Sequence, residues 1–361
     1  MNSGLEAVLR AHALRYPLME PVDAVKLVYQ HTMGGGHLVR DEQESLRRLQ
    51  AELAQVTQEE GPLAEPLGND LARMRLGALP AAGLSPQTAN RLFVLSAREV
   101  QGGMEALAEA LTALRAACAE GIFGFDTARL DAYLEGYIQA GYPAPSHSEA
   151  YRQAYHPAYR VVRTEYLKAA PLMAAMDRCM ARQGRVRVAI DGRSAAGKST
   201  LGRLLARVYD ANLFHMDDYF LRPEQRTGQR YAEPGGNVDR ERFAAEILAG
   251  LDSGKAFAYR PFDCGSGRLA PAITVQPRPV AIVEGSYSLH PALRSGYDVK
   301  VFLDIDPQLQ SRRILARNGA QMHHRFMTQW VPLEEAYFSA LSIREACDFI
   351  LGPEGEPAAE P

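Results

Sequence analysis

The chain has 361 residues, 47% of them hydrophobic and 23% charged, a composition typical of a soluble globular protein with room for two domains. Its formal net charge of −3 gives no support for non-specific binding to nucleic acid or to an anionic membrane surface. No apolar run is long enough to cross a membrane, and the four cysteines form no C-x-x-C pair, which argues against a disulfide framework and a thiolate zinc site and favours a reducing, cytoplasmic location.

Residues 1–170 are predicted to form a mainly α-helical N-terminal domain without strands. Asp41 fits the N-cap of one helix, and Ser85 followed by Pro86 fits the N-cap and first turn of another. Prolines and glycines between residues 59 and 69 predict a loop. The predicted helical segments lie at residues 24–33, 42–53, from 86 onward, 102–119 and 126–140.

Two stretches of this domain carry unusual polar residues. His31 and His37 flank three glycines and could bind a metal or an anion, but two ligands fall short of a zinc site, which favours a flexible turn between helices. Residues 141–166 interleave tyrosines with arginines, a pattern that can form a nucleic-acid surface. The acidic net charge favours a tyrosine-rich joint between domains instead, because tyrosine suits half-buried contacts.

From residue 185 onward the pattern changes to apolar runs that alternate with helical segments. Such alternation predicts a doubly wound parallel sheet, in which ligands gather at the carboxyl ends of the strands. The domain is assigned to residues 185–353, preceded by a connecting helix at 171–184 and followed by a disordered tail at 354–361. The predicted strands lie at residues 185–191, 212–216, 280–283, 299–303 and 347–351.

The first of these strands leads into Gly192-Arg-Ser-Ala-Ala-Gly197-Lys198-Ser199, the G-x-x-x-x-G-K-[ST] pattern of a phosphate-binding loop. The glycines let backbone N–H groups approach a phosphate, Lys198 reaches the outer phosphates, and the Ser199 hydroxyl can coordinate Mg²⁺. The strand before it and the helix after it disfavour the alternative of an ordinary glycine turn. We therefore expect a P-loop NTPase fold that binds ATP and Mg²⁺. The expected nucleotide-binding residues are Gly192, Ser194, Ala195, Ala196, Gly197, Lys198, Ser199 and Thr200.

Further polar residues follow the strands and helices around this loop. Asp217 and Asp218 end the second strand, where a carboxylate could accept the proton of a hydroxyl that is phosphorylated; a solvated strand end or a helix cap is the alternative. Glu284 ends an apolar run and could hold Mg²⁺ as a hard oxygen ligand. Arg313 and Arg317 lie on one predicted helix and could stabilise the transferring phosphoryl group; a solvated basic helix face is the alternative.

Together these motifs resemble the uridine kinase and phosphoribulokinase superfamily of P-loop kinases, over residues 185–353, roughly half of the chain. The resemblance implies ATP·Mg²⁺ as donor, a small-molecule hydroxyl as acceptor and Asp217 as the base. It implies Ser199 and Glu284 as the metal-linked residues, and Lys198, Arg313 and Arg317 as the groups that act on the phosphates.

The resemblance also implies an acceptor site, with departures from the pattern of the family. Asp218 and Tyr219 of the MDDYF motif and Asp239 of the GGNVDRERF segment are expected to contact the acceptor. Phe262 stands where uridine kinases have a tyrosine, and the histidine expected soon afterwards is missing from residues 264–267. Kinase chemistry therefore carries over better than uridine specificity.

The sequence thus predicts ATP-dependent phosphorylation of a hydroxyl on a small metabolite, such as a nucleoside or another ribosyl or sugar-like compound. A nucleotide-dependent regulator, whose helical domain binds a partner, is the first alternative. A nucleic-acid end kinase is the second, although it needs a basic channel for which the tyrosine–arginine stretch is the only hint. Neither the acceptor's identity nor assembly as a homo-oligomer follows from the sequence.

Overall fold

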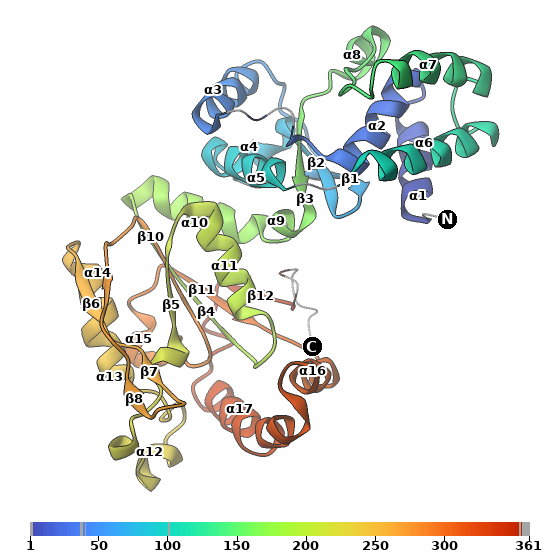
Figure 1. The fold of residues 1–361 in the computed structure, drawn as a ribbon. Helices are drawn as coiled ribbons and strands as arrows, with labels where there is room; N and C mark the ends of the chain where they lie inside the picture. Colours follow the sequence, from blue (N-terminus) through green and yellow to red (C-terminus); the bar gives the residue numbers. More distant parts are fainter. Residues whose placement is uncertain (1–2, 37–38, 40, 100–101, 354, 356–361) are drawn as a thin grey trace. The chain divides into compact units, whose positions relative to one another are not determined.

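The computed structural model describes residues 3–36, 39, 41–99, 102–353 and 355 and divides into two compact units, Met1–Ala170 and Pro171–Pro361 (Figure 1). Each unit has its own hydrophobic core. Within the described residues, no helix is both long and apolar enough to cross a membrane. The tail predicted at 354–361 lies outside the described residues except for Gly355.

The first unit is mainly helical, as its periodicity predicts. Its helices are α1 (Ser3–Arg15), α2 (Pro21–Met33), α3 (Glu42–Leu53), α4 (Leu79–Ala82), α5 (Pro86–Arg98), α6 (Met104–Ala119), α7 (Thr127–Gln139), α8 (Glu149–Tyr155) and α9 (Thr164–Lys168). Both predicted N-caps are confirmed: the Asp41 carboxylate accepts from the Glu44 N–H at 2.7 Å, and the Ser85 hydroxyl accepts from the Thr88 N–H at 3.1 Å. These bonds satisfy backbone donors that a helix start leaves without a partner.

The prediction that this unit has no strands is wrong. An antiparallel sheet holds β1 (Ala64–Gly68), β2 (Leu71–Arg75) and β3 (Tyr159–Arg163), with β2 in the centre. Strand β1 lies inside the predicted loop, because an edge strand tolerates a proline such as Pro66. Strand β2 shows no alternation, since its first four residues are all buried. A tight turn at Asn69 and Asp70, both at positive φ, joins the two strands.

The tyrosines of the stretch predicted to join the domains lie in the first unit. Tyr142, Tyr151, Tyr155 and Tyr159 pack in the first unit's own core, together with leucines of α1, α2 and α6. Tyr166 is fully buried in α9. The tyrosines therefore supply apolar area and defined ring contacts to this unit.

The second unit contains the predicted parallel sheet, with the strand order β12-β11-β4-β10-β5. The first strand in sequence is thus the central one, and the chain leaves it toward both sides, which makes its carboxyl end the topological switch point. The strands are β4 (Val186–Gly192), β5 (Asn212–His215), β10 (Val280–Glu284), β11 (Val299–Leu303) and β12 (Phe349–Leu351). The P-loop NTPase fold is therefore confirmed by this sheet and its loop.

Helices and two small hairpins complete the second unit (Figure 1). The helices are α10 (Ala170–Gln183), α11 (Lys198–Tyr209), α12 (Gly228–Ala232), α13 (Arg240–Phe243), α14 (Ala249–Ser253), α15 (Pro291–Arg294), α16 (Pro307–Arg325) and α17 (Val331–Ala340). The hairpins, which were not predicted, pair β6 (Phe257–Tyr259) with β9 (Ile273–Val275) and β7 (Phe262–Asp263) with β8 (Arg268–Leu269).

Helix α10 belongs to the second unit. Its Met173 is fully buried, and the hydroxyl of Tyr209 on α11 donates to the Met173 carbonyl oxygen at 3.1 Å and lies 2.9 Å from an Asp177 carboxylate oxygen. One face of the sheet, with Ala189 and Phe302, packs on the aliphatic and aromatic core formed with α13 and α17. Helix α11 contacts β4, β10 and β5, so the sheet is covered where the nucleotide loop begins.

Candidate active site

The phosphate-binding loop joins the central strand to α11 through backbone that only small residues tolerate. Gly192 has φ 132° and Gly197 has φ 104°, and Ala195 between them has φ 61°. A side chain at Gly192 is excluded on steric grounds, because its Cβ would lie 2.1 Å from the Leu303 carbonyl oxygen of β11. The neighbouring Arg193 N–H donates to the same oxygen at 3.1 Å. The loop is therefore shaped by the adjacent strand as well as by its own glycines.

Lys198 begins α11 and places its ammonium inside the loop. Its Nζ donates to the carbonyl oxygens of Gly192 at 2.7 Å and Arg193 at 2.9 Å. The first backbone N–H groups of α11 and the positive end of the helix dipole lie at the same end of the helix. The loop thus combines a fixed cation with oriented N–H donors, the features that bind phosphate.

Ser199 and Glu284 form a pair of hard oxygen ligands next to the loop. The Ser199 hydroxyl donates to Glu284 Oε2 at 3.0 Å, and Glu284 is buried at the end of β10, between β4 and β5. Two oxygens bound side by side to an octahedral Mg²⁺, at about 2.1 Å each, lie about 3 Å apart, so this pair fits that ion. Within the described residues, no group of three or more His, Cys, Asp or Glu side chains could hold a metal. Phosphate oxygens and water would supply the other ligands.

His215, at the end of β5, contacts the other oxygen of Glu284 through Nδ1. This hydrogen bond raises the pKa of His215, against the opposing effect of burial. The sequence reasoning did not select His215. Its position, one residue before the MDDYF motif, could have suggested it, since the residue opposite Glu284 in the β5–β10 register is His215.

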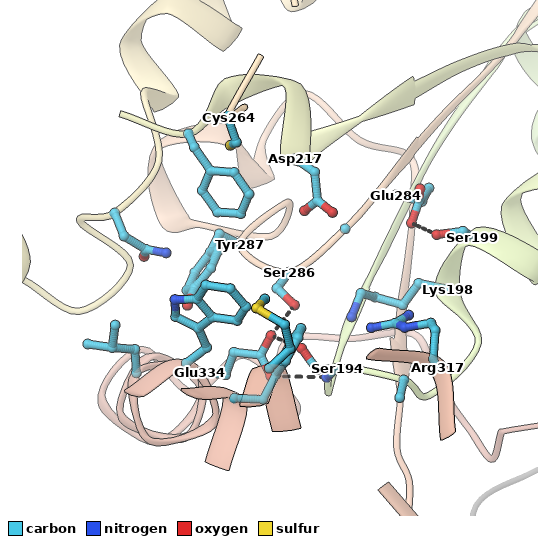
Figure 2. Close-up of a pocket in the computed structure, with 18 of the residues that line it drawn as sticks. Ser194, Lys198, Ser199, Asp217, Cys264, Glu284, Ser286, Tyr287, Arg317 and Glu334 are labelled. Carbon is cyan, nitrogen blue, oxygen red and sulfur yellow. Dashed lines mark hydrogen bonds between the residues drawn. The ribbon is translucent and has the colours of Figure 1, made fainter. Parts of the chain in front are cut away.

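Asp217 follows β5 and faces a cavity of about 1040 Å³ that also contains the loop, Glu284 and the arginines of α16 (Figure 2). Asp217 keeps an exposed surface on this cavity, although neighbouring protein partly desolvates its carboxylate. Burial raises the pKa of Asp217, Glu284 adds to the increase, and Lys198 opposes it. A carboxylate with a raised pKa, beside a phosphate-binding loop, is suited to accept a proton.

Both predicted arginines line this cavity. Arg313 donates to the Ala195 carbonyl oxygen of the loop at 3.4 Å, and the Arg317 guanidinium lies 5.9 Å from the ring centre of Phe326. Gly319, at φ 76°, interrupts the regular helix two residues after Arg317. Three further arginines line the cavity and were not predicted: Arg203, Arg226 and Arg325.

The structure does not bring the four predicted acceptor contacts into the cavity. Tyr219 is fully buried, and its hydroxyl donates to Glu246 at 3.0 Å. Asp239 caps α13 by accepting from the Arg242 N–H at 3.1 Å. Phe262 is buried in its hairpin, and Asp218 does not line the cavity. Their neighbours in sequence or space line it instead: Phe220, Asn237, Cys264 and Tyr287.

The remaining predicted nucleotide residues divide into two groups. Ser194, Ala195, Gly197, Lys198, Ser199 and Thr200 line the cavity. Gly192 and Ala196 are buried parts of the loop and do not line the cavity. Their contribution is to the course of the backbone, which is the role that the motif assigns to small residues.

Glu334 of α17 is the main site residue that sequence reasoning missed. It is 4% exposed, and its carboxylate accepts from the Ser194 N–H at 3.0 Å, from the Ser194 hydroxyl at 2.7 Å and from the Ser286 hydroxyl at 2.7 Å. The carboxylate therefore holds the loop to the segment after β10 (Figure 2). No short motif marks it, because it lies 140 residues from its partner in the loop.

Asp191, directly before the loop, is a second missed residue. It is fully buried, and its carboxylate accepts from the N–H groups of Gly192, Tyr287 and Leu289 and from the Tyr337 hydroxyl, at 2.7–3.1 Å. Burial raises the pKa of Asp191 to about 6, while these hydrogen bonds oppose the increase. A single carboxylate thus ties three segments of the site together.

Replacing Glu334 with alanine is expected to lower the stability of the second unit by at least about 2 kcal/mol, because buried donors without an acceptor cost about 1–3 kcal/mol each. Glu334→Gln keeps one carbonyl acceptor and should recover part of the loss. Thermal unfolding followed by circular dichroism measures the change. Glu345→Ala, at an exposed position, is the control, and equal melting temperatures for Glu334→Ala and Glu345→Ala would refute the structural role of Glu334.

His31, for which a flexible turn was favoured over one half of a metal or anion site, is buried in the first unit. Its Nδ1–H donates to the Leu67 carbonyl oxygen at 2.6 Å, and burial lowers its pKa. His37 lies outside the described residues. His31 therefore connects α2 to β1, and a shared site with His37 stays a prediction.

Comparison with known proteins finds no matching family model and no match among curated proteins. The solved structures similar to about half of the chain include several that are described as kinases. A possible uridine kinase from Bacillus stearothermophilus is 19% identical over 50% of this chain and 98% of its own, with a TM-score of 0.36. A candidate fructose transport system kinase from Silicibacter is 25% identical over 48% and 94%, with a TM-score of 0.40. Shikimate kinase from Bacteroides thetaiotaomicron is 16% identical over 47% and 87%, with a TM-score of 0.26.

Proposed function

We propose that the second unit is an ATP-dependent kinase that phosphorylates a hydroxyl group of a small metabolite, a nucleoside or another ribosyl or sugar-like compound. The main support for this proposal is the set of residues that share one cavity. A carboxylate suited to accept a proton, Asp217, faces the same cavity as the loop cation, Lys198, and the Ser199–Glu284 oxygen pair. A nucleotide-binding protein that does not transfer phosphate needs no such carboxylate.

In this proposal, the loop N–H groups and Lys198 hold the phosphates of ATP, as the geometry of the loop favours. Asp217 accepts the proton of the attacking hydroxyl, and Arg313 and Arg317 stabilise the negative charge on the transferring group. Ser199 and Glu284 would hold Mg²⁺, which would neutralise phosphate charge. Glu334 fixes the position of Ser194 in the loop.

Other residues that line the cavity are suited to bind a small polar ring. Phe220, Tyr287 and Trp330 supply aromatic faces, and Asn237 supplies an amide. A volume of about 1040 Å³ is at the upper end for a single small ligand and accommodates a nucleotide with a small acceptor. We assign this reaction to the cytoplasm, where ATP is available and thiols stay reduced; Cys118, Cys179, Cys264 and Cys347 are all free.

An ADP-release assay on the full chain tests this function. The purified protein, with ATP and Mg²⁺, is screened against nucleosides, ribosyl cofactor precursors and small polyols, with Lys198→Ala as the background. We expect acceptor-dependent ADP release and a phosphorylated acceptor detected by mass spectrometry. ATP binding without ADP release for any acceptor would contradict the kinase and favour a nucleotide-dependent regulator.

The pH dependence of kcat/KM provides a separate prediction. The base must be ionised to accept a proton, so a raised pKa of Asp217 moves the loss of activity to a higher pH than for an ordinary aspartate, whose pKa is about 3.9. A pH–rate profile measures this acid limb. The pKa of His215 is also raised, so titration of His215 could produce a second loss of activity at low pH. In His215→Gln this contribution is absent, and the loss of activity that remains belongs to Asp217. A limb at or below the ordinary aspartate value would contradict this assignment.

A further inference from the structure

The first unit contains a second cavity, of about 340 Å³, which the proposed kinase reaction does not use. Both unusual stretches of the N-terminal sequence contribute to it. Gly34 and Gly35 come from the glycine turn, and His147, Tyr159 and Arg160 come from the tyrosine–arginine stretch. The fold thus brings together, around one cavity, stretches that lie more than one hundred residues apart in the sequence. The contact between His147 and Asp23 is an example.

Most polar groups of this cavity are fixed by one another. Asp23 accepts from His147 Nδ1–H at 2.8 Å, so the other ring nitrogen, Nε2, accepts from the Tyr159 hydroxyl at 2.6 Å. Gln30 donates to the same hydroxyl oxygen at 3.1 Å. Burial lowers the pKa of His147 to about 4, so the ring is neutral at pH 7 and this direction of donors is the only consistent one. These side chains form a rigid polar wall.

A buried arginine stands behind that wall. Arg73 is 2% exposed, donates twice to the Gln30 amide oxygen and places its guanidinium 4.6 Å from the ring centre of Tyr159. Its carboxylate partner, Glu65, lies 3.5 Å away on the adjacent strand. Tyr159 has its pKa raised by burial, so its hydroxyl remains protonated. The wall is therefore suited to hold a ligand and not to remove a proton from one.

Lys26 lines the cavity and has more N–H donors than its hydrogen bond to the protein uses. Its ammonium carries three N–H groups and donates to the Pro145 carbonyl oxygen at 2.8 Å, and no described carboxylate forms an ion pair with it. Burial and the nearby charge of Arg73 lower the pKa of Lys26 to about 8 while the Asp23 carboxylate opposes the decrease, and Lys26 stays mostly protonated at pH 7. The negative charge of Asp23 compensates this partly desolvated cation only in part, so an anion bound beside the Lys26 ammonium would be favourable.

Apolar and backbone groups form the rest of the cavity. Phe93 and Tyr29 supply aromatic surface, and Arg160 lies over the Phe93 ring while donating to Glu52 at 2.7 Å. At Gly35 the wall is bare backbone; a Cβ there would meet the Phe93 ring at 3.1 Å. The volume lies at the lower end of the range for small-molecule sites, so it admits a small metabolite and not a dinucleotide.

We propose that this cavity binds a small organic anion, with a phosphate or carboxylate group placed against the Lys26 ammonium and its carbon skeleton against Phe93 and Tyr29. The site is distinct from the ATP loop, and every residue that forms it belongs to the first unit. It gives the N-terminal unit a ligand-binding role that goes beyond the proposed kinase reaction.

Isothermal titration calorimetry on the full chain tests this proposal. The Lys198→Ala background weakens the phosphate-binding loop, and the probes are ribose 5-phosphate, inorganic phosphate, malate and, as a neutral control, ribose. We expect at least one of the three anions to bind saturably while ribose does not. Because a charge-assisted hydrogen bond contributes about 1.5–3 kcal/mol, Lys26→Met should weaken that binding about tenfold or more. Binding of ribose 5-phosphate or of malate alone identifies the phosphate or the carboxylate as the recognised group.

The matched control is Lys168→Met, an exposed lysine of the same unit, which should leave the affinity unchanged. Reductive methylation of the Lys198→Ala chain, followed by mass spectrometry, supplies a readout that needs no change at Lys26. The bound anion should protect Lys26 and not Lys168. The proposal is overturned if none of the anions binds, if Lys26→Met binds as tightly as its parent, or if Lys26 is not protected.

Discussion

Replacing Asp217 with asparagine is expected to leave ATP binding intact and to slow phosphoryl transfer by about 10²–10⁴-fold, the usual contribution of a positioned general base. Asparagine has nearly the same shape, so the cavity keeps its form, but the amide cannot accept the hydroxyl proton. ATP affinity is measured by calorimetry and transfer by ADP release with a saturating acceptor. A loss of transfer without a loss of ATP affinity is the result that identifies Asp217 as a base.

The adjacent carboxylate offers a matched comparison. Asp218 has the same chemistry one residue along, but it does not line the cavity, and its charge interacts with His215 and Arg242. Asp218→Asn should therefore lose much less activity than Asp217→Asn. Transfer at the normal rate in Asp217→Asn would remove Asp217 as the base, and equal losses in both variants would point to a general effect of charge near the site.

Lys198→Ala is expected to lower kcat/KM for ATP by about 10²–10³-fold, the effect of removing one strong donor to a charge that develops in the transition state. Unlike Asp217→Asn, it should weaken ATP binding as well, because the ammonium contacts phosphates in both the ground state and the transition state. Calorimetry with ATP and initial rates of ADP release measure the two effects.

The loop itself needs a check in this variant, since Lys198 also donates to two loop carbonyls. Thermal unfolding of Lys198→Ala shows whether the fold persists. Lys198→Arg keeps the charge, but its planar fork cannot replace a point charge inside the loop, so it should remain defective. The exposed Lys255→Ala should behave as the parent. ATP turnover by Lys198→Ala at the parent rate would exclude the loop as the donor site.

The architecture of the second unit could be read from the sequence because its signals are local. Each parallel strand is a short apolar run, and the loop between β4 and α11 is a fixed spacing of glycines and lysine. All five strands of the large sheet match the predicted apolar runs, and their ends differ from the predicted ends by at most two residues. The hairpins were missed because β7 and β8 have two residues each, too few for any alternation.

The first unit illustrates the limit of the same reasoning. Strand β1 contains a proline and β2 is buried along most of its length, so neither shows the period of two that marks a half-buried strand. The tyrosines were predicted from composition to make half-buried contacts at a joint between domains, yet Tyr151 is 2% exposed within the first unit. Burial is a property of the packed unit, and the partners that bury these rings come from α1 and α2.

The candidate site shows the same difference between residues marked by local motifs and residues whose partners are distant in the sequence. Lys198, Asp217 and Glu284 could be predicted, because each stands at the end of a strand or the start of a helix that a motif marks. Glu334 and Asp191 could not, because their roles are set by partners distant in sequence. Tyr219 and Asp239 were assigned to the acceptor by resemblance, and the structure uses them for the core and for a helix cap.

The contact between Gly192 and Leu303 has a consequence for the order in which the protein forms during synthesis. The nucleotide motif is complete once residue 199 has left the ribosome. The strand that shapes its backbone, however, ends at Leu303. The Glu334 carboxylate, which holds Ser194, lies 140 residues after Ser194 in the chain. Pairing of distant strands is slow, because the loop between them must be closed first. A nascent chain therefore carries the motif for most of the synthesis of this unit before the loop can take its final shape, so the proposed nucleotide binding would report that the unit is finished.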